Sequence, residues 1–195
     1  SYVITLSHPE LETITWEKTS AELNFQYPLE LPALVPGEQY TVKITTSNFV
    51  ASTEDGETVW LEVLDSEQQQ EFFGLLEELR QQDLSPQTEI ILESMLYEKF
   101  ELYSQAIAIL SGYVRENPDA MTVRERLAEL YSQIGLAREE RREYQQIEAL
   151  TQGEITEIRQ RTLDRLTEFA ELNEEDDLAE KYRAESQKIT QQLGY

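Results

Sequence analysis

The spacing of apolar residues changes once along this chain, near residue 65, and this change restricts the folds open to it. Before residue 65, polar and apolar residues alternate in YVITL, YTVKITT and TVWLEV, and four of the six prolines fall in this part. Alternation with a period of two predicts strands, and the prolines predict turns. After residue 65, long amphipathic runs have helical spacing. Strands followed by helices predict an α+β chain of two domains rather than alternating βαβ units.

The helical part begins with the run DSEQQQEFFGLLEELRQQ at 65–82. Its first or second residue, Asp65 or Ser66, is the expected helix cap. Its apolar residues have helical spacing: Phe72, Leu75, Leu76 and Leu79. A helical solenoid needs end elements that cover its apolar face, so this run is predicted to link the domains and cap the repeats. We predict a β domain over 1–64, a linking and capping helix over 65–84, and helical repeats over 85–195.

The helical part contains two copies of one helical unit. RLAELYSQIGL at 126–136 lies thirty-four residues after LESMLYEKFEL at 92–102. A repeat of this length predicts stacked helix hairpins that share a core. We expect residues 86–151 to form four antiparallel helices in two hairpins, with Leu127, Tyr131 and Leu110 buried.

The period and the residue types resemble the tetratricopeptide repeat (TPR) family. The second unit matches the family's first helix and turn at Leu127, Ala128, Tyr131 and Gly135, and the first unit supplies Ala106 and the closing Pro118. A third unit matches only after an insertion of about five residues, at Leu166, Thr167, Ala170 and Ala179. The resemblance implies an all-α solenoid.

Two glutamates depart from the family pattern. Glu101 stands where the family has glycine, and Glu140 stands where it has alanine. Small residues let paired helices approach closely, so we expect the Glu140 side chain to turn outward or to separate its helix pair.

The β part contains LVPGEQYTVKI, in which Pro36 and Gly37 suit a tight turn. Tyr40, Val42 and Ile44 fall on one face of the following strand, which we expect to be buried. This stretch resembles the tyrosine corner of fibronectin type III and immunoglobulin-like domains. The resemblance implies a small β-sandwich, incomplete in this chain. The order of motifs also resembles cyanobacterial extracytoplasmic modules that precede helical repeats, which favours an extracytoplasmic or periplasmic location without excluding the cytoplasm.

The first strand, SYVITL, reads as an internal strand whose upstream neighbours are missing from the chain. Residue 1 is Ser rather than Met, and we expect upstream sequence in the natural protein. A strand without its neighbour exposes unpaired N–H and C=O groups, so we expect the β domain to self-associate.

Charge excludes several partners. Sixteen basic and 39 acidic residues give a net charge of −23, spread along the whole chain. Nucleic acids and anionic lipid surfaces require clustered lysine and arginine, so we expect neither as a partner. No apolar run is long enough for membrane insertion, and the chain has no cysteine for a disulfide or a cysteine-based metal site.

The sequence does not point to catalysis. The only histidine, His8, precedes Pro9 and is interpreted as an exposed turn residue. The acidic run NEEDD at 173–177 lacks the ligand spacing of a calcium loop and is interpreted as a solvated turn. Neither a phosphate-binding glycine loop nor a nucleophile beside a base is evident, so we predict no enzymatic activity, no cofactor and no metal.

Recognition of a protein or peptide is the remaining prediction. In TPR proteins the first helix of each pair lines a groove, and the resemblance places these residues there: Thr88, Ile91, Met95, Glu98, Lys99, Thr122, Glu125, Glu129, Ser132 and Gln133. Glu125 and Glu129 lie one helical turn apart and are expected to present one negative patch. The basic clamp that some family members use for a terminal carboxylate is absent, which favours a basic or neutral extended peptide.

Two classes of function follow from these expectations. The first is a non-enzymatic scaffold or adaptor that binds proteins through an acidic groove. The alternative is a structural component of the cell envelope that forms a homo-oligomer through its β domain or helices. Repeats that act only as a structural spacer also remain open.

Overall fold

The computed structural model describes all residues except 1, 9–14, 21–26, 29, 47–56 and 195. It divides into two compact units, Ser1–Phe73 and Gly74–Tyr195. The first contains a four-stranded antiparallel sheet and the second is helical, so the predicted α+β class is confirmed. The division falls within the helix that follows the sheet.

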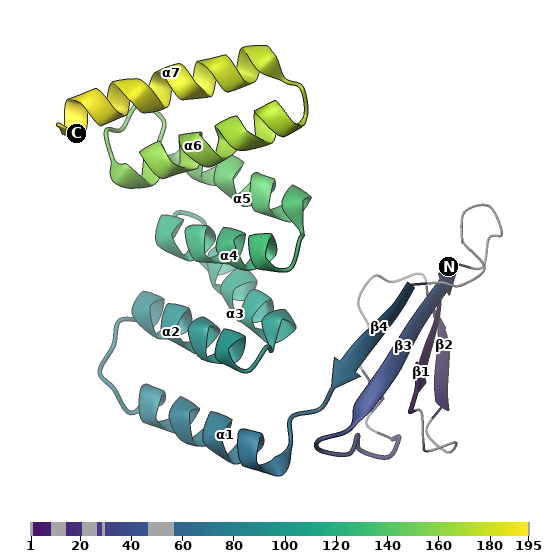
Figure 1. Cartoon of the computed structure of the whole chain (residues 1–195). Coiled ribbons are helices and arrows are strands. Elements are labelled where there is room, and N and C mark those ends of the chain that lie inside the picture. The colour runs from purple at the N-terminus through teal and green to yellow at the C-terminus, as the bar shows by residue number, and fades with distance from the viewer. Residues whose placement is uncertain (1, 9–14, 21–26, 29, 47–56, 195) are drawn as a thin grey trace. The chain divides into compact units, whose positions relative to one another are not determined.

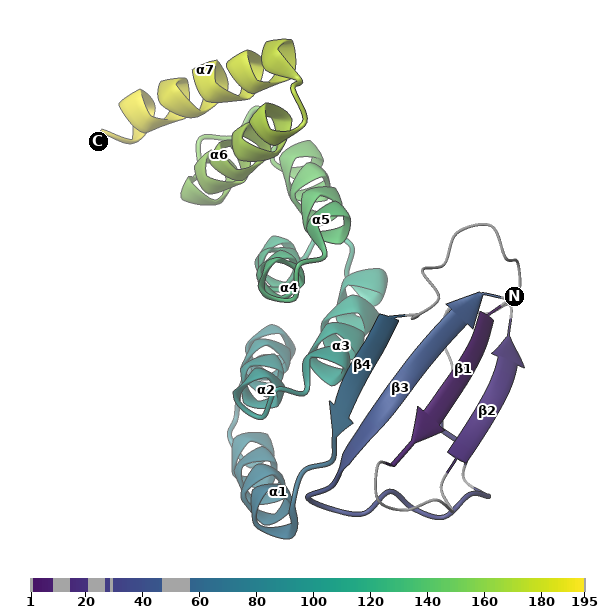
Figure 2. The ribbon, with the colours of Figure 1, turned by 45° about the vertical axis from the view of Figure 1, so that its right-hand side comes forward.

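The strands are β1 (Tyr2–Ser7), β2 (Thr15–Ser20), β3 (Gln39–Thr46) and β4 (Glu57–Glu62). Their order in the sheet is β2-β1-β3-β4 (Figure 2). Ile4 on β1 lies opposite Lys18 on β2 and Ile44 on β3. The prediction that the first strand lacks a neighbour is therefore wrong, because the next strand along the chain folds back against it. The described strands of this unit form this one sheet, and the second sheet of a sandwich is not found among the described residues.

The turn before β3 has the geometry expected of a tyrosine corner. Gly37 has a φ of 81°, and the Glu38 N–H donates to the Val35 carbonyl at 3.2 Å, which closes the turn. The hydroxyl of Tyr40 accepts a hydrogen bond from the Val35 N–H at 2.8 Å. Tyr40 is fully buried. The predicted burial of this strand face weakens along β3, because Ile44 is exposed beside Glu57 at the start of β4.

His8 is buried, contrary to its interpretation as an exposed turn residue. Its Nε2 lies 3.2 Å from Oε2 of Glu38, and its ring packs edge-on against Tyr40 with the centroids 5.1 Å apart. The histidine therefore fills space beside the tyrosine corner, which the sequence pattern around Pro9 did not indicate.

The helices are α1 (Ser66–Arg80), α2 (Pro86–Lys99), α3 (Tyr103–Glu116), α4 (Met121–Gln133), α5 (Ala137–Leu150), α6 (Glu157–Leu172) and α7 (Asp176–Leu193). Asp65 begins α1 with a reciprocal cap. The Gln68 N–H donates to Asp65 Oδ1 at 2.8 Å, and the Asp65 N–H donates to Gln68 Oε1 at 2.9 Å. Ser85 caps the N-terminus of α2 and Thr156 caps the N-terminus of α6. The side chain of each accepts a hydrogen bond from the N–H three residues later.

Helices α2 to α7 form three pairs, α2–α3, α4–α5 and α6–α7, each joined by a three-residue turn (Figure 1). The middle of each turn holds one residue in the left-handed conformation: Glu101, Gly135 and Glu174. The residue after it donates its N–H to a carbonyl five residues back, as in Leu136 to Tyr131 at 2.8 Å. The first and second helix pairs are offset by thirty-four residues, and the second and third by thirty-nine. The third pair thus lies where an insertion of about five residues placed it.

The helical unit has two buried clusters. One joins α3, the segment before α4, and α4: Ala106, Leu110, Val114, Ala120, Val123, Leu127 and Leu130. The other joins α4 to α7: Ala128, Tyr144, Ile147, Leu163, Leu166, Phe169, Tyr182 and Ile189. The predicted burial of Leu127 and Leu110 is confirmed, whereas Tyr131 is only partly buried against the first cluster.

Candidate partner-binding surface

The first helices of the three pairs, α2, α4 and α6, form a row with α4 in the middle (Figures 1 and 2). We call this row the first-helix surface. Side chains cross from each helix to the next, because Arg126 on α4 reaches Ser94 on α2 and Arg161 on α6 reaches Glu125 on α4.

The residues predicted to line a groove lie on α2 and α4 within this surface. Seven are exposed: Thr88, Met95, Lys99, Thr122, Glu129, Ser132 and Gln133. Three are partly buried: Ile91, Glu98 and Glu125. The structure therefore places them on two adjacent helices, and it adds charged residues of α6 that the sequence analysis did not include.

Arg126 joins α2 to α4. Its guanidinium donates to the carboxylate of Glu98 on α2 and, at 3.2 Å, to Glu129 three residues further along α4. Gln133 also donates to Glu98. Burial alone would raise the pKa of Glu98, but the hydrogen bonds from Arg126 and Gln133 lower it below its usual value. Glu98 is therefore held in its charged form.

Arg161 joins α4 to α6 through a two-pronged contact with Glu125. Its Nε lies 2.9 Å from Oε1 and its Nη2 lies 3.0 Å from Oε2. A second carboxylate, Glu157, lies 3.9 Å from Nη1. The Glu125 side chain is only 14% exposed. Glu125 and Glu129, which were expected to present one negative patch, are each paired with an arginine.

Arg165 joins α6 to α5. It donates to Glu140 on α5 and to Glu168 on its own helix, and it lies 3.5 Å from the Ser132 hydroxyl of α4. Its guanidinium also lies 5.4 Å from the centre of the Phe169 ring. These contacts fix the arginine between two helix pairs.

Of the two outcomes expected for Glu140, the outward turn does not occur, because the residue is buried. Its repeat equivalents, Ala106 and Ala179, are also buried. The longer side chain is accommodated because Arg165 supplies a charge partner inside the helix stack. The nearby Tyr144 hydroxyl has a pKa raised to about 12, first by burial and then by the negative charge of Glu140.

Each of these arginines contacts two glutamates. The three groups are Arg126 with Glu98 and Glu129, Arg161 with Glu125 and Glu157, and Arg165 with Glu140 and Glu168. We call them the arginine triads. Two negative charges and one positive charge leave each triad with one excess negative charge. The outer carboxylate of each triad is well exposed: Glu129 at 52%, Glu157 at 62% and Glu168 at 55% of the side chain.

The sequence contains a signal for two of the triads that the sequence analysis missed. The tetrapeptides RLAE at 126–129 and RLTE at 165–168 are thirty-nine residues apart, which is the offset of the second and third helix pairs. In both, the arginine binds the glutamate three residues later. The glutamates that complete the triads from other helices lie 25 to 36 residues away and have no such local signal.

The first helix pair has apolar residues at the same two positions. Leu92 and Met95 on α2 are the repeat equivalents of Arg126 and Glu129 on α4. Leu92 is 36% exposed and Met95 is 50% exposed. At these equivalent positions the first-helix surface is therefore apolar on α2 and ion-paired on α4 and α6.

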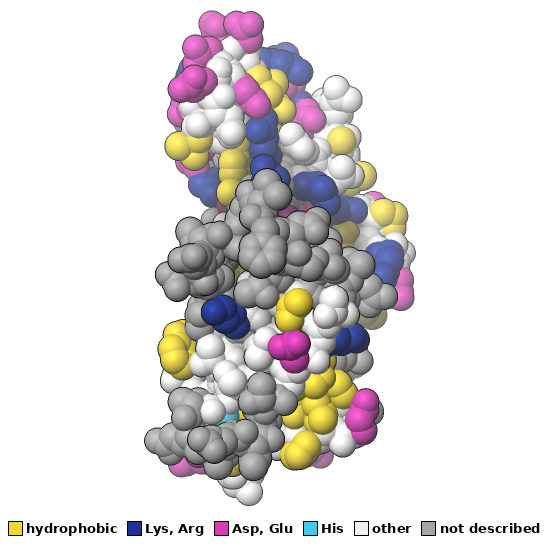
Figure 3. Space-filling model, turned by 90° about the vertical axis from the view of Figure 1, so that its right-hand side faces the viewer, with side chains coloured by type: hydrophobic (Ala, Val, Ile, Leu, Met, Phe, Trp, Pro, Cys, Tyr) yellow, Lys and Arg dark blue, Asp and Glu magenta, His cyan; other side chains and the backbone are white. Residues whose placement is uncertain are grey.

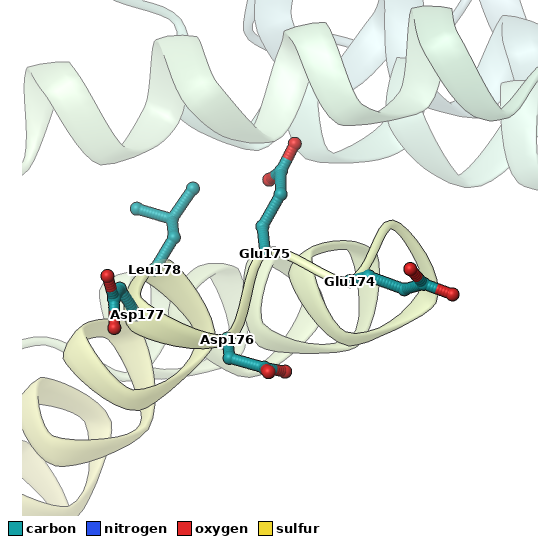
Figure 4. A pocket seen from close by; sticks show the side chains of 5 residues that line it. All are labelled: Glu174, Glu175, Asp176, Asp177 and Leu178. Carbon is teal, nitrogen blue, oxygen red and sulfur yellow. The ribbon is translucent and has the colours of Figure 1, made fainter.

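The turn between α6 and α7 forms a shallow depression lined by Glu174, Glu175, Asp176, Asp177 and Leu178 (Figure 4). The four carboxylates point in different directions, and Glu175 is bound by Arg141 from α5. Over the described residues, no group of three or more potential metal-binding side chains is found. Residues 173–175 form the turn between α6 and α7, whereas Asp176 and Asp177 begin α7.

On the face shown in Figure 3, charges of both signs lie on the helical unit. At the height of α6 and α7, acidic and basic side chains lie next to one another (Figure 3). None of the helices, as far as they are described, has the length and apolar character needed to cross a membrane. Comparison with known protein families and with curated protein sequences finds no match.

Proposed function

We propose that this chain is a non-enzymatic interaction module whose first-helix surface binds an extended segment of a partner protein with a basic character. The observation that carries the proposal is the set of three arginine triads, each with one excess negative charge. The order of the triads along α4 and α6 gives an extended ligand several equivalent contacts.

The triads also explain why a basic ligand is favoured. Each arginine holds its glutamates in place, so the exposed carboxylates are oriented before a ligand arrives and less side-chain freedom is lost on binding. A lysine or arginine of the ligand adds a second cation to each outer carboxylate. The resemblance to TPR proteins, whose first helices bind peptides, supports the same surface.

The first prediction tests this function with charge-neutral variants. Glu129→Gln with Glu168→Gln removes two of the three well-exposed triad charges with little change in side-chain size. Because each exposed ion pair contributes about 0.2–1 kcal/mol and two are lost, we expect lysine-containing peptides to bind roughly two- to thirtyfold more weakly to the double variant. The measurement is a calorimetric titration with basic, neutral and acidic peptides at low and at moderate salt.

The control is Glu180→Gln, which removes an exposed charge from α7, outside the first-helix surface. This control should bind basic peptides as the parent chain does, and binding should weaken with salt in both. The proposal fails if basic and acidic peptides bind equally, or if none binds.

A further inference from the structure

The apolar end of the first-helix surface distinguishes one repeat from the other two. Leu92 and Met95 lie three residues apart on one side of α2, where α4 and α6 carry an arginine and a glutamate. Both side chains are exposed, although a lysine, arginine or glutamate at these positions would be fully compatible with a surface helix. A ligand lying across all three helices therefore meets an apolar contact before it meets the triads.

The charge of the surface decides what kind of ligand fits. Glu129 on α4 and Glu168 on α6 are the repeat equivalents of Met95, and both carboxylates are exposed. Glu157 adds a third exposed carboxylate on α6. A ligand with an apolar side chain over Met95 therefore has its complementary charges, which are positive, over α4 and α6. An acidic or uniformly apolar segment matches only part of the surface.

The spacing of the ligand follows from helix packing. Packed helices lie about 8–10 Å apart, and an extended chain rises about 3.3 Å per residue, so neighbouring first helices are about three residues apart along a bound peptide. Helices α2 and α4 are in direct contact, whereas α4 and α6 are bridged by side chains. Along the bound peptide, the contacts on α4 and on α6 are therefore three or four residues apart.

We infer that the partner segment carries a leucine-like side chain three residues from one lysine or arginine, with a second basic residue three or four residues further on. The apolar side chain packs on Leu92 and Met95, and the basic side chains contact Glu129 and Glu168. This inference rests on the proposed function, and it adds the residue pattern of the ligand.

The test uses the full chain and two synthetic peptides. The anchored peptide has the pattern Leu-x-x-Lys-x-x-Lys with small polar residues between, and the second peptide has serine in place of leucine. The variant Leu92→Arg with Met95→Glu gives the first repeat the same ion pair as the other two. We expect it to bind the anchored peptide about tenfold more weakly, which corresponds to about 1.4 kcal/mol, and to bind the serine peptide as the parent does.

A control variant, a second variant and a reversed peptide complete the experiment. Leu150→Arg replaces an exposed leucine at the end of α5 and should leave both affinities unchanged. Met95→Gln alone serves as the second variant should the double variant fold poorly by circular dichroism. The anchored peptide is also made with its sequence reversed. Whichever of the two peptides binds more tightly shows the direction in which the peptide runs across the helices.

Two results overturn the inference in different ways. If the lysine peptides bind with a clear salt dependence but leucine adds nothing in either direction, the inference fails and the proposed function stands. If neither lysine peptide binds the parent chain, the proposed function fails and the inference fails with it.

Discussion

At the scale of single residues, the left-handed positions in the turns of the three helix pairs are the most informative feature of the helical unit. Gly135 fills one of them, whereas Glu101 and Glu174, each with a φ of 58°, fill the other two. Residues with a Cβ atom are strained in this conformation, and glycine is not. The repeat geometry is therefore imposed on two glutamates by the helices on either side of each turn.

This strain predicts that Glu101→Gly stabilises the protein. The gain expected is about 0.5–1 kcal/mol, because the relief of strain exceeds the extra freedom that glycine gives to the unfolded chain. The midpoint of urea denaturation measures it. The matched control is Gly135→Ala, which should lose a similar amount. A Glu101→Gly variant that is less stable than the parent would show that this glutamate makes a contact outweighing its strain.

At the scale of helices, arginines hold neighbouring elements together. Arg126 links α2 with α4, Arg161 links α4 with α6, and Arg165 links α5 with α6. The Glu140 partner of Arg165 is the most deeply buried carboxylate of the triads, at 4% exposure of its side chain. A buried charge without its partner is costly, so this contact is the most sensitive of the set.

Removing the arginine alone should therefore destabilise the helical unit. We expect Arg165→Met to lower the free energy of unfolding by about 3 kcal/mol, because Glu140 loses its main charge partner. Adding Glu140→Ala, which restores the alanine found at Ala106 and Ala179, should recover most of that loss. Both are measured by urea denaturation.

Arg183→Met is the comparison for that experiment. Arg183 pairs with Glu171 across two side chains that are each about half exposed, so its loss should cost less than about 1 kcal/mol. Equal losses for the two arginine variants would mean that burial of Glu140 does not raise the cost of removing its partner.

At the scale of the whole molecule, the stability of the helical unit is divided between two clusters that meet at α4. Leu127 and Leu130 belong to the first cluster, and Ala128 on the same helix belongs to the second. Repeat proteins of this kind gain stability from each unit and from contacts between neighbours, so local opening of one end is possible without the other.

Two matched truncations test this division. Leu110→Ala in the first cluster and Leu163→Ala in the second each remove a fully buried side chain, at an expected cost of about 2–5 kcal/mol. Amide hydrogen exchange should accelerate most in α2 and α3 for the first variant and in α6 and α7 for the second. Equal acceleration in all helices for both variants would show that the unit opens only as a whole.

Much of the fold could be predicted from local sequence. The alternating and helical spacings placed the change from strands to helices, the Pro36-Gly37 turn led to Tyr40, and Asp65 was among the expected caps. These features depend on residues within a few positions of one another, where backbone sterics and periodicity act directly. The thirty-four-residue repeat extended the prediction to helix pairs, because similar segments bury similar faces.

The candidate surface depended on tertiary structure. Sequence alone placed Glu125 and Glu129 on one side of a helix, but only the fold brought Arg161 onto Glu125 and Arg165 onto the buried Glu140. The neighbour that completes β1 was likewise decided by the sheet, since β2 returns to pair with it. Partners separated by 25 residues or more leave no periodic trace, because an ion pair needs only that two side chains meet. The sequence thus determined the elements and their repeat, and packing determined which charges are buried, paired or left at the surface.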